Sequence, residues 1–219
     1  MNLAVFDLDH TLLDGDSDYL WGQYMVEQGL VDGAEYARKN AEFYRQYQDG
    51  TLDIQAFARF SMAPLAANDP ARLRELRACF VRERIEPRVA PGAWPLLARH
   101  RAAGDILLIT TATNRFITEP IAALFSVDNL LATEPEMRDG RYTGQLAGTP
   151  NYREGKVVRL KEWLAGRPES FGLITCYSDS LNDLPLLSFA GRAFAVDPDA
   201  TLRAEAEKRG WPIISLKSS

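Results

Sequence analysis

Two clusters of carboxylate and amide side chains stand directly after apolar runs of the sequence, far apart along the chain. Asp7 and Asp9 follow the N-terminal run, and Asp179, Asn182 and Asp183 follow a run that ends near residue 177. Residues i and i+2 of an extended backbone point to the same side, so the first two carboxylates can face one site. Neighbouring carboxylates are costly unless a cation or a proton compensates them. The spacing therefore predicts a cation-binding site.

The chemistry of these groups favours magnesium and a phosphate ester. An oxygen-rich pocket suits Mg²⁺, which keeps some of its waters and binds a substrate phosphate. We expect no His or Cys ligand, which disfavours zinc. A carboxylate can attack phosphorus, and a second carboxylate can serve as the general acid and base. Lys156, near the start of a predicted helix, supplies the positive charge that such a pocket needs to hold a phosphoryl dianion.

The elements that must position these residues are predicted to be buried parallel strands. Apolar runs with strand-forming residues recur along the chain and alternate with helical patterns such as 93–103. These runs cover residues 2–6, 106–110, 171–177 and 193–196. Alternation of this kind favours a parallel sheet covered by helices on both faces. Both acidic clusters then lie at the carboxyl edge, where open parallel sheets bind their ligands.

The stretch from Ser17 to about Arg84 breaks the alternation and is predicted to be a helical insert. Its aromatic residues repeat at helical spacing, at Tyr36, Phe43, Tyr44 and Tyr47. They are predicted to pack within the insert, with a substrate-facing aromatic wall as the alternative. A further short edge strand is predicted at 141–145, after the turn signal Asp139-Gly140.

The composition excludes several classes of protein. The chain has 219 residues, of which 46% are hydrophobic, which is enough for a substantial core. A net charge of −5 without any basic run argues against a nucleic-acid partner. No apolar run approaches the roughly 20 residues of a membrane helix, and no signal peptide is evident. Two cysteines fit a reduced, cytoplasmic protein.

Four segments together resemble the motifs of the haloacid dehalogenase superfamily, in the order that this superfamily has them. They are Asp7-Leu-Asp-His-Thr-Leu-Leu13, Leu107-Leu-Ile-Thr-Thr-Ala-Thr-Asn114, Gly155-Lys156 and Tyr177-Ser-Asp-Ser-Leu-Asn-Asp183. Within the superfamily, the chain is most similar to the phosphoserine-phosphatase-like group (subfamily IB), which includes bacterial histidinol-phosphatases. The resemblance implies a Rossmann-like α/β core at 1–14 and 88–219. It also implies an inserted all-helical cap of type C1 at 15–87.

The resemblance also implies roles for individual residues. Asp7 becomes the nucleophile and Asp9 the general acid and base, while Asp7, the Asp9 carbonyl and Asp179 become magnesium ligands. Thr111 and Lys156 are expected to contact the phosphoryl group. Strand alternation alone does not choose between Thr110 and Thr111, and alignment with the family motif favours Thr111.

Other residues are expected around the reacting groups. Asn182 and Asp183 are expected to orient the metal site and Lys156. The candidate substrate-binding residues are Thr11, Asp16, Ala112, Thr113 and Arg115.

Two departures from the family pattern bear on the substrate. Phosphoserine enzymes usually carry a Glu nine residues after the nucleophile to hold the substrate amine, and this chain has Asp16 there. Asp can still pair with an ammonium group. After Thr111 the chain has Ala112-Thr113-Asn114-Arg115 instead of two glycines and a Phe, so the phosphoserine pocket is not fully reproduced. Arg115 is either a substrate-carboxylate anchor or a surface residue.

The sequence therefore predicts a Mg²⁺-dependent phosphomonoesterase that acts on a small metabolite through an aspartyl-phosphate on Asp7. Histidinol phosphate and phosphoserine are the first candidates. The acidic residues Asp14, Asp16 and Asp18 favour a cationic substrate, unless they only cap the helix that starts near Ser17. A phosphomutase of the same chemistry is the alternative, and a phospho-accepting signalling domain is a more distant one. The oligomeric state stays open between monomer and dimer.

Overall fold

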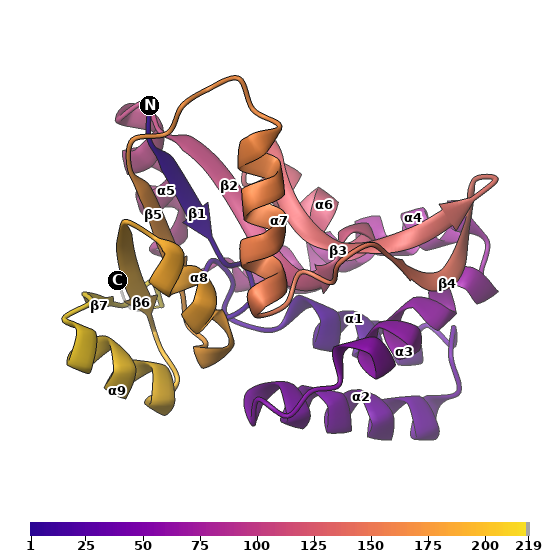
Figure 1. Ribbon diagram of the computed structural model, residues 1–219. Coiled ribbons are helices and arrows are strands. Elements are labelled where there is room, and N and C mark those ends of the chain that lie inside the picture. Colours follow the sequence, from indigo (N-terminus) through magenta and orange to yellow (C-terminus); the bar gives the residue numbers. More distant parts are fainter. Residues whose placement is uncertain (218–219) are drawn as a thin grey trace.

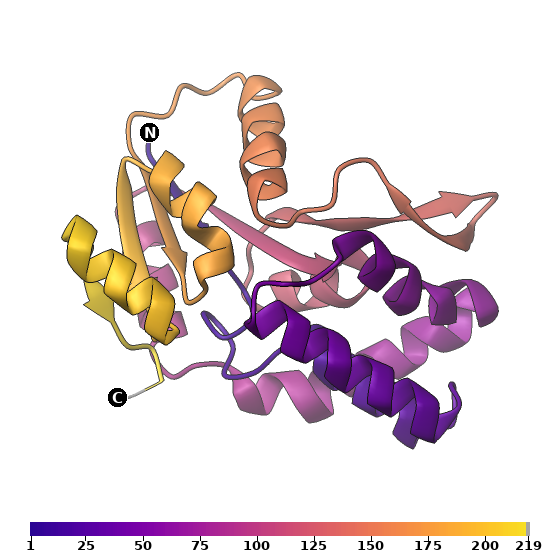
Figure 2. The ribbon, with the colours of Figure 1, turned by 60° about the horizontal axis from the view of Figure 1, so that its bottom comes forward.

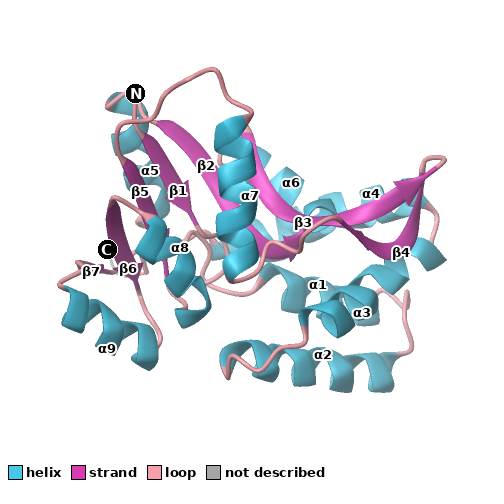
Figure 3. Ribbon diagram, in the orientation of Figure 1, coloured by secondary structure: helices cyan, strands magenta, loops and turns pink. Residues whose placement is uncertain are grey.

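The computed structural model describes residues 1–217, which form a seven-stranded sheet with helices on both faces (Figures 1 and 3). The strands are β1 (Leu3–Phe6), β2 (Ile106–Asn114), β3 (Asn129–Arg138), β4 (Arg141–Ala147), β5 (Ile174–Ser178), β6 (Arg192–Val196) and β7 (Ile213–Ile214). Their order is β4-β3-β2-β1-β5-β6-β7. β3 and β4 pair antiparallel, and the other neighbours pair parallel.

Helices cover the two faces of the sheet and build a second layer at one end of it. Those along the sheet are α5 (Ala93–Ala102), α6 (Arg115–Leu124), α7 (Glu154–Ala165), α8 (Leu184–Phe189) and α9 (Ala200–Arg209). The others are α1 (Ser17–Glu27), α2 (Gly33–Gln48), α3 (Ile54–Ala67) and α4 (Pro70–Phe80). None of the helices in residues 1–217 is long and apolar enough to cross a membrane.

The apolar run at the N-terminus becomes the central strand because every one of its side chains can be buried there. All four residues of β1 have exposed fractions of 0%. Leu3 and Val5 belong to one apolar cluster with residues of α7, α8 and α9, whereas Ala4 and Phe6 belong to a second cluster with residues of α5 and α6. The predicted parallel α/β core with both faces covered is thereby confirmed.

The predicted helical insert is confirmed as α1 to α4. Aspartates start three of these helices, because Asp16, Asp53 and Asp69 each accept hydrogen bonds from backbone N–H groups of the first turn. Trp21 of α1 packs edge-on against Phe80 and Phe116, so the insert shares a hydrophobic core with α6. The division into a core at 1–14 and 88–219 and a cap at 15–87 stays a prediction.

The sheet extends further than the sequence indicates. The edge strand predicted at 141–145 is present as β4. Its partner β3 is not predicted, because the sequence analysis expects no strand at 129–138. Glu134, Pro135 and Glu136 are poor strand formers, so this segment has no clear strand pattern. The β3–β4 hairpin projects beyond the core and packs on α3, where Gly144 comes close enough that a Cβ would lie 3.3 Å from Ala66 (Figure 1).

Candidate active site

The predicted site residues converge because β1 lies between β2 and β5. Asp7 and Asp9 follow β1, the threonines at 110–113 lie on β2, and Asp179 to Asp183 follow β5. The helices α1 and α2 lie beside this carboxyl edge (Figures 1 and 2). The backbone N–H of Asp7 still donates to the Tyr177 carbonyl at 2.9 Å, so the β1–β5 ladder holds the first carboxylate in place.

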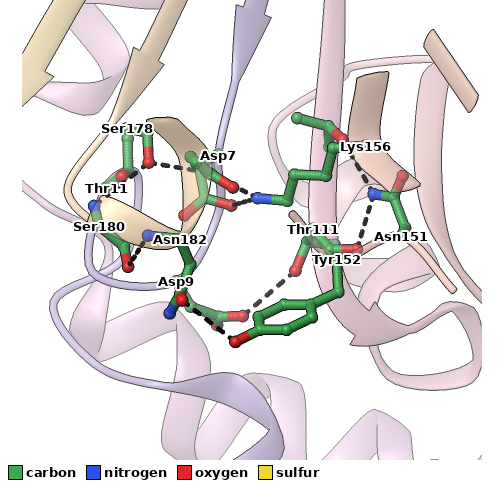
Figure 4. A network of polar contacts seen from close by, with 12 residues as sticks. Asp7, Asp9, Thr11, Thr111, Asn151, Tyr152, Lys156, Ser178, Ser180 and Asn182 are labelled. Atoms are coloured by element: carbon green, nitrogen blue, oxygen red, sulfur yellow. Dashed lines mark hydrogen bonds and ion pairs between the residues drawn. The ribbon is translucent and has the colours of Figure 1, made fainter. Parts of the chain in front are cut away.

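Lys156 lies between two carboxylates in the interior. Its ammonium nitrogen is 2.7 Å from Asp7 Oδ1 and 2.7 Å from Asp183 Oδ2, and its exposed fraction is 2% (Figure 4). Ser178 Oγ also donates to Asp183 Oδ2, at 2.8 Å. Burial disfavours the charged ammonium, but the two carboxylates outweigh this and raise the pKa of Lys156. Lys156 is therefore a fixed positive charge beside Asp7.

Burial also acts on Asp7 itself. It raises the pKa of this carboxyl to about 7, with Lys156 opposing the shift and Asp183 adding to it. A cation bound beside Asp7 would favour its ionised form, which is the form that can attack phosphorus.

Asp9 is held by donors from two other segments. Ser17 N donates to Asp9 Oδ1 at 2.7 Å, and Thr113 Oγ1 and Thr111 Oγ1 donate to Asp9 Oδ2 at 2.9 and 3.3 Å. Figure 4 shows the Thr111 contact. Thr110 is engaged elsewhere, because its hydroxyl accepts from Asn151 Nδ2 at 2.9 Å. Of the two threonines that sequence left open, Thr111 is the one that lines the cavity next to Asp9.

Asp179 lies near Asp7 without a basic partner. Its Oδ1 accepts a hydrogen bond from Thr11 Oγ1 at 2.9 Å, so Thr11 contacts this carboxylate. Burial, followed by the charge of Asp7, raises the pKa of Asp179 well above its usual range. No Lys, Arg or His within residues 1–217 forms an ion pair with it. Residues 1–217 contain no group of three or more His, Cys, Asp or Glu side chains arranged around a metal site. The magnesium ligands Asp7, Asp9 and Asp179 stay a prediction.

Asn182 and Asp183, adjacent in sequence, contact different parts of the molecule. Asp183 binds Lys156, as the sequence predicts. Asn182 instead accepts from Tyr152 Oη and Arg153 Nε, both at 3.1 Å, and donates to the Tyr47 carbonyl at 3.0 Å. Its role in orienting Lys156 stays a prediction. The sequence analysis did not identify Tyr152 and Arg153, although their place just before Gly155-Lys156 is a signal that could have found them.

A narrow cavity lies between these groups and the helices α1, α2 and α3. Asp7, Asp9, Thr111, Ala112 and Thr113 line it from the core. Its other lining residues are Asp16, Asp18, Tyr19, Asn40, Phe43, Tyr44, Tyr47, Leu52, Ile54 and Phe57. The aromatic repeat of α2 is thus divided. Phe43, Tyr44 and Tyr47 face the cavity, while Tyr36 stacks on Phe60 of α3 within the insert.

Two acidic residues from the start of α1 face this cavity. Burial raises the pKa of Asp18 to about 7, and the pKa of Asp16 rises well above its usual range for the same reason, with Asp9 adding to both shifts. Asp16 also accepts from Tyr19 N at 2.8 Å, so it is both the helix cap and a cavity residue. Asp14 is exposed and pairs with Lys217 at 3.1 Å.

Arg115 does not line the cavity. Its Nε lies 2.8 and 2.9 Å from the two oxygens of Glu134, and its Nη2 donates to the Leu130 carbonyl at 2.8 Å. These contacts hold Arg115 against β3. Its place among the substrate-binding residues stays a prediction, which these contacts do not support. The sequence analysis missed β3, whose Glu134 carboxylate and Leu130 carbonyl bind the guanidinium.

Comparisons with known proteins show the family of the chain. The family model of the haloacid dehalogenase-like hydrolases matches residues 4–188. A histidinol-phosphatase of Neisseria meningitidis serogroup C (strain 8013) is 47% identical over 220 residues, which cover 99% of each chain. A crystal structure of a protein of unknown function from Bordetella pertussis Tohama I matches with a TM-score of 0.93 and 45% identity, over 98% of each chain.

A more distant structure, described as a phospho-aspartyl intermediate analogue of phosphoserine phosphatase, has the same fold. It matches with a TM-score of 0.69 and 18% identity, over 99% of this chain and 93% of its own. The chain belongs to the haloacid dehalogenase-like hydrolase family. The predicted family, its α/β fold and the assignment to its phosphatases are confirmed.

Proposed function

We propose that this protein is a Mg²⁺-dependent histidinol-phosphatase that forms an aspartyl-phosphate on Asp7. The observation that carries the proposal is the buried Lys156 between Asp7 and Asp183 at the carboxyl edge, with Asp9 facing the same cavity as Asp7. The 47% identity to a histidinol-phosphatase over the full length of both chains supports the choice of substrate.

The reaction has two steps that share the same two carboxylates. In the first, an oxygen of Asp7 attacks phosphorus and the bond from phosphorus to the ester oxygen breaks. Asp9 gives its proton to the departing alkoxide, which leaves as the alcohol. In the second step, water attacks the phosphorus, Asp9 takes a proton from this water, and the bond to Asp7 breaks. Dividing one displacement in this way lowers the barrier of each step.

The surrounding groups stabilise and orient these reactants. Lys156 places its positive charge beside Asp7, where the phosphoryl group arrives. The hydroxyls of Thr111 and Thr113 and the N–H of Ser17 hold Asp9 in one orientation. Such an arranged acid and base contributes typically about 10²–10⁴-fold to the rate.

The oxygens near Asp7 fit a magnesium ion. Asp7, the carbonyl of Asp9 and Asp179 would hold it, and Asp179 is a half-buried carboxylate without a cationic partner in residues 1–217. Bound there, magnesium supplies the positive charge that balances these carboxylates and the phosphoryl oxygens.

The cavity suits an amino-alcohol phosphate with a ring. Asp18 is buried and Asp16 is half-buried, and burial together with the charge of Asp9 raises the pKa of both carboxyls. Neither forms an ion pair with a basic residue within 1–217, so a positive charge is missing beside them. The ammonium group of histidinol phosphate would supply that charge. The aromatic side chains of Phe43, Tyr44 and Tyr47 offer apolar faces to its imidazole ring. Phosphoserine shares the ammonium group but not the ring.

The alternatives differ in the fate of the phosphoryl group. A phosphomutase would pass it from Asp7 to another hydroxyl instead of to water, with the same residues. A signalling domain would keep it on Asp7 as a switch, which the hydrolase family of this chain disfavours. For location, we infer the cytoplasm. The free Cys79 and Cys176 are consistent with a reducing compartment.

Phosphate release from histidinol phosphate, phosphoserine and a sugar phosphate tests the proposal, with Mg²⁺ or EDTA. We expect Mg²⁺-dependent turnover that is fastest with histidinol phosphate. Asp7→Asn should reduce it by about 10³-fold or more, because a neutral amide does not form the covalent intermediate. Asp128→Asn, at an exposed position outside the site, is the matched control. Turnover retained in Asp7→Asn would refute the mechanism, and isomerised product without free phosphate would identify a mutase.

A further inference from the structure

The cavity beside Asp7 is too small for a phosphate ester in this structure. Its free volume is about 30 Å³, whereas pockets for small ligands usually have volumes of about 300–1,000 Å³. A separate cleft of about 410 Å³ lies outside, lined by Gly50, Arg153 and Asn182 among others. Tyr47 lines the cavity and residues 48–50 line the cleft, so the end of α2 lies between them. A phosphate ester therefore needs the cavity to widen, and the end of α2 is one of the segments that can move to widen it.

Two side chains of the core hold the end of α2. Arg153 Nη2 donates to the Gly50 carbonyl at 2.5 Å, and Asn182 Nδ2 donates to the Tyr47 carbonyl at 3.0 Å. The two side chains are also joined to each other, because Arg153 Nε donates to Asn182 Oδ1 at 3.1 Å. We call these two side chains and the two carbonyls the latch.

The electrostatics of a helix end favour this contact. The last carbonyls of a helix lack partners within the helix and carry partial negative charge, so a cation near them is stabilising. Arg153 brings its guanidinium to this end, 5.2 Å above the ring of Tyr152. Its backbone has φ 50° and ψ −119°, an unfavourable conformation for a residue with a Cβ. Strain of this kind is typical of positions where function requires the geometry.

The core half of the latch is anchored to the catalytic ion pair. Lys156 follows Arg153 by three residues, and its backbone N–H donates to the Arg153 carbonyl at 3.1 Å. Asn182 precedes Asp183, whose carboxylate binds the Lys156 ammonium. The donors of the latch are therefore fixed in the core, and the acceptors on α2 are the part that can move away.

We propose that Arg153 is a positioning residue that holds the end of α2 over the bound phosphate ester. The latch forms when the cap closes and breaks when substrate enters or product leaves. This inference rests on the proposed function for the nature of the ester, but the closing contact itself does not depend on that function.

Arg153→Ala provides the first test. Hydrogen exchange of the amides at 46–52 should become at least about tenfold faster, because a charge-assisted hydrogen bond to a helix end is lost. KM for histidinol phosphate should rise about tenfold while kcat changes less than about threefold, since the closed state is less populated but the reacting groups are intact. Arg153→Lys should give a smaller change in both the exchange rate at 46–52 and KM. Arg203→Ala, which removes an exposed charge on α9, is the control.

Two glycines offer a matched test from the cap side. Gly50 and Gly29 both have a left-handed backbone, with φ of 68° and 65°. A Cβ on Gly50 would lie 2.9 Å from Arg153 Nη2, whereas one on Gly29 would have nothing within 4 Å. Gly50→Ala and Gly29→Ala thus share the backbone strain, but only Gly50→Ala should raise KM. Adding Gly50→Ala to Arg153→Ala should then raise KM no further.

The outcomes separate this inference from the proposed function. Unchanged exchange and KM in Arg153→Ala would overturn the latch, as would equal effects of the two glycine variants on KM. Calorimetry checks that each variant folds. If Arg153→Ala does not fold, Arg153→Lys takes its place in the test. Faster exchange in a protein that releases no phosphate from any ester would keep the latch and refute the phosphatase.

Discussion

The acidic residues on the two sides of the cavity have different electrostatic environments. On the core side, Asp7 and Asp183 share the buried ammonium of Lys156 at 2.7 Å each. On the cap side, Asp16 and Asp18 form no ion pair with any basic residue of the described chain, 1–217. Burial and the charge of Asp9 raise the pKa values of both. The core side thus carries its own counter-charge, whereas residues 1–217 supply none to the cap side.

Removing the counter-charge on the core side should have the largest effect on stability. Lys156→Met leaves Asp7 and Asp183 buried without a cation, and breaking a buried ion pair typically costs about 3–5 kcal/mol. We expect a loss of this size in the free energy of unfolding, measured with urea. Phosphate release should fall by at least about 10²-fold, because the developing charge on the phosphoryl group loses its partner.

A second substitution sharpens this test. Adding Asp183→Asn to Lys156→Met removes one of the two stranded carboxylates, so part of the stability should return while activity does not. Lys161→Met, which removes an exposed ammonium from the same helix, is the control. If Lys156→Met loses no more free energy of unfolding than this control, Lys156 is not the counter-charge that stabilises Asp7 and Asp183.

On the cap side, removing a charge should stabilise the protein. The pKa of Asp18 is raised to about 7, against about 3.9 in an unfolded chain. Between these values the folded state keeps a proton that the unfolded state has lost, so stability falls as pH rises through this window. Asp18→Asn removes that loss. Its free energy of unfolding should match the native protein at pH 4 and exceed it by about 1–3 kcal/mol at pH 8.

The same variant should bind its substrate less well. KM for histidinol phosphate should rise about tenfold in Asp18→Asn, because the ammonium loses a buried carboxylate. Asp14→Asn serves as the control, since the side chain of Asp14 is 62% exposed and pairs with Lys217. If the free energy of unfolding of Asp18→Asn does not rise relative to the native protein between pH 4 and pH 8, the folded state does not disfavour the ionised form of Asp18.

The smallest effect is expected for Arg115, a cation whose side chain does not line the cavity. Arg115→Ala removes the contacts to Glu134 and the Leu130 carbonyl, which should cost about 1 kcal/mol of stability. KM should stay within about twofold, because the guanidinium faces β3. Urea unfolding and the KM for histidinol phosphate check this. A tenfold rise in KM at unchanged stability would place Arg115 back among the substrate residues.

The fold and the reacting groups follow from local patterns. The apolar run of β1 followed by Asp7 and Asp9 indicates a buried parallel strand with carboxylates at its end, and the structure has both. The segment 129–138 could not be predicted in the same way. β3 contains Pro135 between two glutamates, and it is a strand because β2 pairs with its first half, residues 129–133, and β4 pairs with its second half, residues 134–138.

The sequence by itself determined the parallel core, the helical insert and the acidic groups at the carboxyl edge, because burial and strand order follow from short-range patterns of polarity. Tertiary structure alone decided which partner each polar side chain found. Arg115 turned to Glu134, Asn182 reached the Tyr47 carbonyl, and Arg153 reached Gly50. These contacts join residues distant in sequence. The packing of α6 against β3 brings Arg115 to Glu134, and the packing of the cap against the core brings Asn182 and Arg153 to the end of α2.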